Sequence, residues 1–113
     1  MIKLKRIYEE PSKADGLRIL VERLWPRGIT AERAQVKRWL KEIAPSPELR
    51  QWYSHALDKW AEFRKRYEAE LDEKADLLKE IKSQAQTQTV TFVYATRDEA
   101  RSSALVLKEY LER

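Results

Sequence analysis

The chain has 113 residues, of which 42% are hydrophobic, 10% aromatic and 37% charged. This length predicts one domain, and the aromatic share argues against disorder. The absence of cysteine excludes disulfides, thiolate nucleophiles and Cys-ligated metal centres. No apolar run approaches the roughly 18 residues that cross a bilayer, and the first residues lack a signal-peptide core. We therefore expect a single domain over residues 1–113, located in the cytoplasm and not associated with a membrane.

Basic side chains exceed acidic ones, with 23 Lys and Arg against 19 Asp and Glu and a net charge of +4. The excess falls in the first half of the chain. A mild local excess of positive charge attracts anions, whereas nucleic-acid-binding domains usually concentrate more charge on one face. A small anionic ligand is therefore expected ahead of nucleic acid.

Two segments near the beginning of the chain are typical of β-strands. Residues 2–8 alternate apolar with mostly basic side chains, as a half-exposed strand does. Residues 18–24 have an Ile-Leu-Val centre that suits a strand covered on both faces. Thr30 is expected to cap a short helix, and residues 36–43 stay open between a third strand and a helical turn.

The middle of the chain carries the strongest helix signals. Ser46 followed by Pro47 predicts an N-cap and a first helical residue. Apolar residues then recur every three or four positions from Trp60 to Ile81, which predicts one long amphipathic helix. Residues 84–88 are polar and are expected to form a linker.

The last quarter of the chain predicts a strand and a closing helix. Residues 89–95 are β-branched and aromatic, as in a buried strand, and Thr96 with Glu99 resembles a capping box. Strands that alternate with helices favour the α/β class. We expect a single compact three-layer sandwich with a small, largely parallel sheet flanked by helices.

Ligands of open α/β sheets usually bind beyond the carboxyl ends of the strands. Arginine binds phosphate or carboxylate through two parallel hydrogen bonds, so arginines near these ends predict an anion pocket. The alternative is a structural role, in which these arginines pair with nearby acidic residues and fix the geometry of the loops. The expected anion-binding residues are Arg18, Arg23, Arg27 and Arg50, and the expected pocket-lining residues are Trp25 and Tyr94.

Two titratable residues are candidates for catalysis. Glu22 lies in a predicted strand, where it would either pair with an arginine or act as a general base with a raised pKa. His55 is the only histidine, which excludes a His-cluster metal site; it could exchange protons or simply pack near a helix. The usual glycine-rich nucleotide loops are absent, and no metal or cofactor is expected.

The residues leave three kinds of function open. An arginine-lined anion pocket is compatible with an enzyme or with a binding protein, so catalysis is undecided. Aromatic residues among basic ones suit single-stranded nucleic acid. A tryptophan-rich surface could also form a homodimer interface.

One segment of the first half is distinctive: Asp15-Gly16-x-Arg18-x-Leu20-Val21-x-Arg23-Leu24-Trp25-Pro26-Arg27-Gly28. Together with later residues such as Trp39, Trp52 and Trp60, it resembles the pattern of the YeaO-like proteins, domain-of-unknown-function family 488. The resemblance covers nearly the whole chain and implies a compact α/β/α fold, but no established activity. It includes Arg18, Arg23, Arg27, Ser46, Arg50 and His55 among the residues of the family pattern.

The chain departs from that pattern at three places. Family members often have Asp where this chain has Glu22, and many have Asp after the histidine, where Ala56 stands here. Many also have Asn-His where this chain has Ser102-Ser103. If that second histidine is catalytic in relatives, this protein lacks it.

Overall fold

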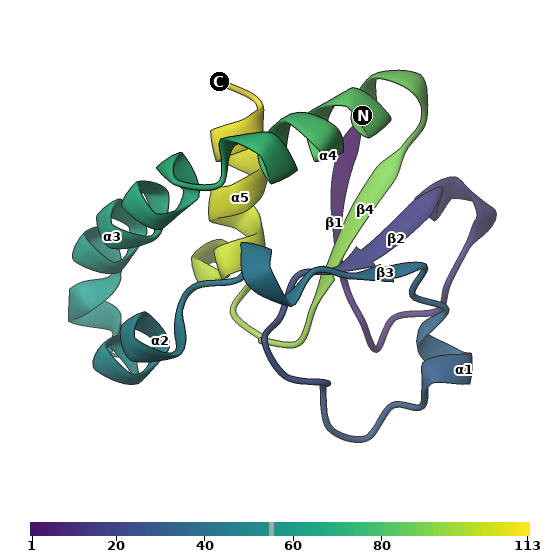
Figure 1. Cartoon of the computed structure of the whole chain (residues 1–113). Helices are drawn as coiled ribbons and strands as arrows, with labels where there is room; N and C mark the ends of the chain where they lie inside the picture. The colour runs from purple at the N-terminus through teal and green to yellow at the C-terminus, as the bar shows by residue number, and fades with distance from the viewer. Residues whose placement is uncertain (55) are drawn as a thin grey trace.

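The computed structural model describes residues 1–54 and 56–113, and these form one sheet of four parallel strands (Figure 1). The strand order is β1-β4-β2-β3. The bounds are Ile2–Arg6 for β1, Leu17–Leu20 for β2, Arg38–Trp39 for β3 and Val90–Tyr94 for β4. The predicted α/β class and parallel sheet are confirmed.

Five α-helices are present in the described part of the chain: α1 (Ala31–Ala34), α2 (Pro47–Tyr53), α3 (Trp60–Asp72), α4 (Ala75–Thr87) and α5 (Ser103–Leu111). Short 3-10 turns are η1 (Lys13–Asp15), η2 (Lys41–Ile43), η3 (Leu57–Lys59) and η4 (Glu99–Arg101). The predicted caps of α1 and α2 are confirmed, since Thr30 accepts from the Arg33 amide and Ser46 from the Leu49 amide. None of the described helices is long and apolar enough to span a membrane.

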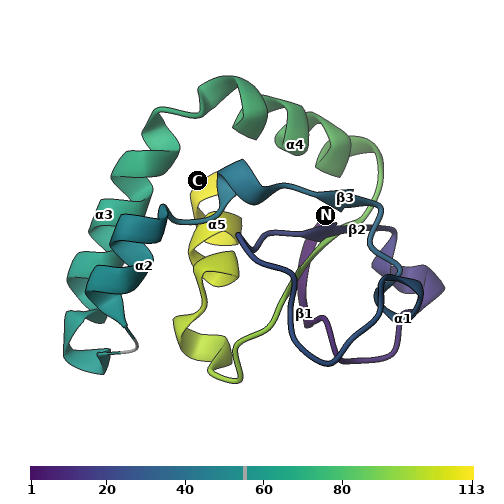
Figure 2. The same ribbon diagram turned by 60° about the horizontal axis from the view of Figure 1, so that its bottom comes forward.

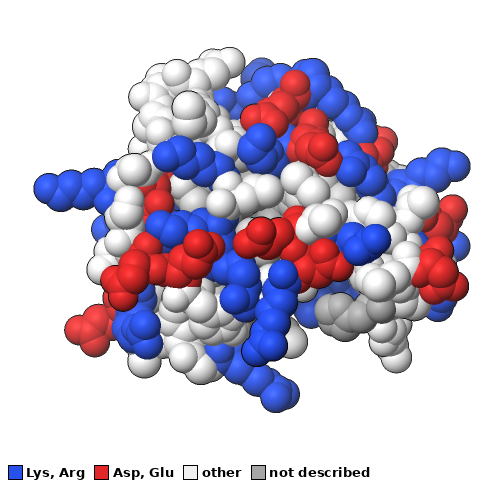
Figure 3. Space-filling model, turned by 180° about the vertical axis from the view of Figure 1, so that it is seen from behind, with Lys and Arg blue, Asp and Glu red and all other residues white. Residues whose placement is uncertain are grey.

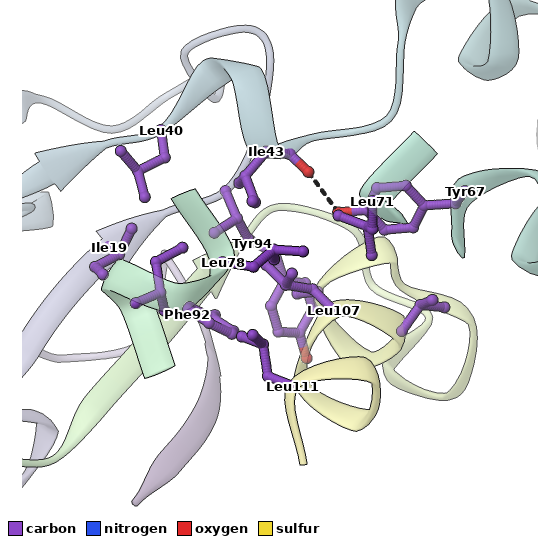
Figure 4. Close-up of a cluster of buried hydrophobic side chains, with 14 of the residues drawn as sticks. Ile19, Leu40, Ile43, Tyr67, Leu71, Leu78, Phe92, Tyr94, Leu107 and Leu111 are labelled. Carbon is purple, nitrogen blue, oxygen red and sulfur yellow. Dashed lines mark hydrogen bonds between the residues drawn. The ribbon is translucent and has the colours of Figure 1, made fainter. Parts of the chain in front are cut away.

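The main hydrophobic core lies between one face of the sheet and helices α2 to α5. Alternate residues of β4, including Phe92 and Tyr94, point into it and meet Leu107 of α5 (Figure 4). The buried Tyr67 hydroxyl donates to the Ile43 carbonyl at 2.6 Å. This bond satisfies a polar group that would be costly to bury alone, and it ties α3 to the loop after β3.

The opposite face of the sheet has a thinner cover. A small cluster forms there from Ile7, Leu20, Ala34 and Val93. The partly buried Trp25 and Trp39 pack against the cluster, with ring centroids 5.5 Å apart. The long helices all lie on the other face, so the layers of the sandwich are uneven.

The prediction of one long helix from Trp60 to Ile81 is wrong, because the chain turns between α3 and α4 at residues 73–74. A straight helix over residues 60–87 would be about 40 Å long, which exceeds the 36 Å largest extent of the molecule. The break lets both helices curve around α5 (Figure 2). The predicted linker at 84–88 is also wrong for residues 84–87, which belong to α4.

Residues 36–43 contain both of the structures left open by the sequence. A two-residue strand, β3, pairs with β2 and is followed directly by Leu40 and the turn η2. A segment this short has too few residues for its hydrophobic periodicity to distinguish a strand from a helical turn.

The turn before β2 depends on Gly16, whose φ is +61°. The next amide, that of Leu17, donates to the Thr89 carbonyl at 2.9 Å. A Cβ at Gly16 would lie 2.2 Å from this carbonyl oxygen, whereas a Cβ at Gly28, where φ is +77°, would lie in open space. Only glycine allows the two backbones to approach this closely at the start of the β2–β4 pairing.

Candidate functional site

A cavity of about 670 Å³ lies beyond the carboxyl ends of β2 and β4. Residues 22–24, which follow β2, line it together with residues 95, 96 and 98, which follow β4. Helices α2 and α3 and the beginning of α5 close the other sides. The cavity is therefore at the edge of a parallel sheet where ligands commonly bind.

Three arginines line the cavity: Arg23, Arg50 and Arg101. Arg23 is half-buried and is held by the backbone carbonyls of Ala44 and Pro45, at 3.3 and 3.2 Å. Within the described residues neither Arg23 nor Arg50 forms an ion pair, while Arg101 pairs with Asp98 at 3.4 Å. Two guanidinium groups at this cavity thus have no contacting carboxylate in the part of the chain that the structure describes.

Glu22 connects the two strand ends across the cavity wall. Its Oε1 accepts a hydrogen bond from the Ala95 amide at 3.1 Å. Burial raises the pKa of the Glu22 carboxyl above its ordinary value, and the Ala95 amide and the Arg50 charge offset part of this rise. Glu22 forms no ion pair with an arginine within the described residues, and its role as a general base stays a prediction.

The helix that opens toward the cavity begins later than predicted. The capping box of Thr96 and Glu99 is wrong, because residues 99–101 form η4 and α5 begins at Ser103. The Ser102 hydroxyl caps α5 by accepting from the Leu105 amide at 3.1 Å. Ser102 and Ser103 both line the cavity, so the first amides of α5 bring the positive end of its dipole to this side.

An apolar wall of the cavity comes from α2, η3 and α3. Tyr53, Trp60 and Phe63 pack together, with centroid distances of 4.5 Å for Tyr53–Phe63 and 5.3 Å for the stacked Trp60–Phe63 pair. Leu24 and Leu57 also line the cavity and are 71% and 56% exposed. The cavity is thus lined by both cationic and exposed apolar side chains.

Arg18 lies apart from this cavity. It is 3% exposed, donates to Asp15 at 2.9 Å and to the Ala34 carbonyl at 2.9 Å, and packs on the opposite face of the sheet. The Lys5 ammonium group also donates a hydrogen bond to Asp15 Oδ1 at 3.1 Å. Arg18 therefore has the structural role that pairing with nearby acids predicts, and we leave it out of the pocket.

Three more of the predicted site residues lie away from the cavity. Arg27 is exposed in the loop before α1, Trp25 donates to the Ile29 carbonyl at 2.7 Å on the thin face, and Tyr94 is buried in the main core. None of these three lines the described cavity. His55 lies outside the described residues.

Of the predicted site, the structure brings together Glu22, Arg23 and Arg50. Sequence reasoning missed Arg101 and the serines at the start of α5. A signal for Ser102 was available, since it precedes the apolar positions of the closing helix by the spacing of an N-cap, whereas no comparable signal marks Arg101. No three described His, Cys, Asp or Glu side chains are placed to hold a metal ion.

Comparison with known proteins identifies the family. The model of a family described as "Inactive DUF488-N3 subclade" matches residues 1–113. The chain is 43% identical over 110 residues to the uncharacterized protein Rv3073c of Mycobacterium tuberculosis, covering 97% of this chain and 92% of the relative. It is 39% identical over 110 residues to the uncharacterized protein YeaO of Escherichia coli, covering 97% and 96%. No solved structure matches the chain. These matches span nearly its full length, and the chain belongs to the YeaO-like DUF488 family.

Proposed function

We propose that this protein binds a small anion, through a phosphate or carboxylate group, in the cavity beyond β2 and β4. The observation that carries the proposal is the convergence of Arg23, Arg50 and Arg101 on one cavity from three separate segments. Two of these arginines have no contacting carboxylate among the described residues. Arg23 is held in place by two backbone carbonyls and is not neutralised by a described carboxylate, and such a guanidinium group is well suited to bind a planar or tetrahedral anion.

The two acidic residues that line the cavity leave an excess of positive charge, because three arginines line it as well. Asp98 pairs with Arg101, and the Glu22 carboxylate accepts from a backbone amide. The capped beginning of α5 adds further donors and a favourable dipole. The anion would therefore lie between the arginines and the first turn of α5.

The protein is proposed to bind this anion without transforming it. The matching family is described as an inactive subclade. Ser102 and Ser103 line the cavity at the positions where the resemblance to the family implies Asn-His in many members, and a serine hydroxyl cannot replace an imidazole as a base near neutral pH. In this proposal Glu22 makes anion affinity depend on pH, because its negative charge opposes the ligand's charge.

Nucleic acid is the competing ligand. On the face seen in Figure 3, Lys and Arg side chains are interspersed with Asp and Glu. Mixed charge of this kind makes this face a poor electrostatic footprint for a polyanion. A third possibility, a homodimer without a ligand, is tested separately by sedimentation at two concentrations.

The decisive experiment compares Arg50→Ala with Arg27→Ala. Both arginines are exposed, but only Arg50 lines the cavity. Melting temperatures are measured in phosphate, sulfate, small carboxylates, nucleotides and a short single-stranded oligonucleotide, with sodium chloride added to hold the ionic strength constant. A ligand at about 100 times its Kd adds roughly 2.7 kcal/mol, equivalent to about 10 °C or more in a domain of this size.

We expect at least one small anion to stabilise the wild type and Arg27→Ala, and to lose its effect in Arg50→Ala. Equal responses of the two variants would refute the proposed site. Stabilisation by the oligonucleotide alone, falling steeply with added salt, would favour nucleic acid.

A further inference from the structure

We infer that the ligand of this cavity is an aromatic anion, in which the phosphate or carboxylate group is attached to a flat ring. This inference rests on the proposed function and specifies the class of ligand. It follows from the aromatic residues that line the cavity, which a bare inorganic anion would leave without a partner.

Three aromatic rings line the cavity. Phe63 and Tyr53 are 4% and 8% exposed, whereas Trp60 is only half-buried. The Trp60 indole stacks on Phe63 at an interplanar angle of 22° and also lines the cavity. Its uncovered part is an aromatic surface of the kind on which another flat ring packs favourably.

Two leucines border the same cavity. Among the described residues, the exposed large hydrophobic side chains are Met1, Tyr8, Leu24 and Leu57. Leu24, from the loop after β2, and Leu57, from η3, both line the cavity. Single exposed leucines are ordinary on a protein surface, but two from distant parts of the chain at one cavity mark an apolar area that a ligand would cover.

The size of the cavity also exceeds the needs of an inorganic anion. A volume of about 670 Å³ falls within the range of roughly 300–1,000 Å³ that is typical of pockets for organic ligands. The charged and aromatic groups come from several elements around the cavity. Arg23 and Arg101 lie in the segments after β2 and β4, Arg50 and Tyr53 both belong to α2, and Trp60 and Phe63 belong to α3. A ligand with a charged group and a flat ring can contact both kinds of side chain.

Titration calorimetry with a matched series of ligands tests the inference. Inorganic phosphate supplies only the charge, butyl phosphate adds an aliphatic body, and phenyl phosphate adds a ring. We expect phenyl phosphate to bind about tenfold more tightly than inorganic phosphate, because ring burial adds apolar contact, and more tightly than butyl phosphate. Butyl phosphate binding as well as phenyl phosphate would overturn the aromatic class.

A spectroscopic measurement locates the ring. The chain has four tryptophans, and the indole N–H resonance of Trp60 is identified as the one missing in Trp60→Phe. Phenyl phosphate is expected to shift this resonance more than inorganic phosphate does, through the ring current of the bound phenyl group. A Trp60 resonance that phenyl phosphate leaves unmoved would overturn the inference.

Variants separate the inference from the proposed function. The double variant Leu24→Ser with Leu57→Ser is expected to narrow the affinity gap between phenyl and inorganic phosphate, whereas Arg27→Ala leaves both affinities unchanged. Equal affinities of the two ligands in the wild type, with both lost in Arg50→Ala, would reject the aromatic anion and retain anion binding. If neither ligand binds the wild type, both the inference and the proposed function are rejected.

Discussion

Replacing each of the two glycines by alanine gives a sharp test of the turn that begins the sheet. Both Gly16 and Gly28 have a positive φ, but only Gly16 is crowded. At φ +61° and ψ −127°, an alanine at position 16 would be strained by about 1–3 kcal/mol. Its Cβ would also lie 2.2 Å from the Thr89 carbonyl oxygen, so the two must separate by about 1 Å to reach ordinary contact.

That separation weakens the hydrogen bond from the Leu17 amide to Thr89, a loss of about 1 kcal/mol. We expect Gly16→Ala to cost about 2–4 kcal/mol in total, equivalent to a fall of about 10–25 °C in melting temperature. Gly28→Ala has open space around its Cβ and is expected to cost only about 1 kcal/mol. Thermal and urea unfolding followed by circular dichroism would measure both. Equal destabilisation of the two variants would refute the argument from crowding.

Three further substitutions test the polar groups of the fold by urea unfolding. Tyr67→Phe leaves the Ile43 carbonyl without its buried donor and is expected to cost about 1–3 kcal/mol; an unchanged unfolding midpoint would contradict this. Because the folded-state pKa of Glu22 is raised, its ionisation destabilises the fold as the pH rises. Glu22→Gln should therefore exceed the wild type in stability near about pH 8, and the advantage should disappear near about pH 4. The pKa of Asp15 is lowered, since bonds from Ser12, Lys5 and Arg18 outweigh its burial. Asp15→Asn should consequently be less stable at neutral pH, with a deficit that shrinks below about pH 4; a deficit independent of pH would point to packing instead.

The parts of the fold that could be predicted from the sequence are those specified by adjacent residues. Ser46 and Pro47 mark the beginning of α2 because an N-cap and its first helical residue need no distant partner. The apolar character of residues 90–94 likewise identifies a strand that is buried along its full length. Such signals are local, and they give the correct class of fold.

The break between α3 and α4 depends on the size of the whole core. The hydrophobic spacing continues through residues 73–74, so the sequence pattern alone favours one helix. A straight helix over residues 60–87 would be about 40 Å long, longer than the 36 Å largest extent of the molecule, so the two segments pack on the core with a turn between them. This limit on helix length exists only in three dimensions.

The candidate site shows the same limit. Arg18 and Arg23 are five positions apart and look equivalent in the sequence. Arg18, however, is part of β2, and its side chain points away from the main core to the face where Asp15 pairs with it. Arg23 follows the strand and reaches the cavity. The face on which a strand residue lies depends on its register with neighbouring strands, and that register is fixed by pairings with residues far along the chain.

The position of β4 in the sheet has a consequence for the kinetics of folding. The last strand in the chain lies between β1 and β2, so Ile2 pairs with Val90 and Leu17 also pairs with Val90. A nascent chain that has not yet released residues 90–94 from the ribosome offers β1 no partner in the sheet and leaves β2 with only the two-residue β3. Because such distant pairings raise the contact order, folding is expected to be slower than in a helical bundle of similar length. The sheet is therefore expected to form only after residues 90–94 have left the ribosome.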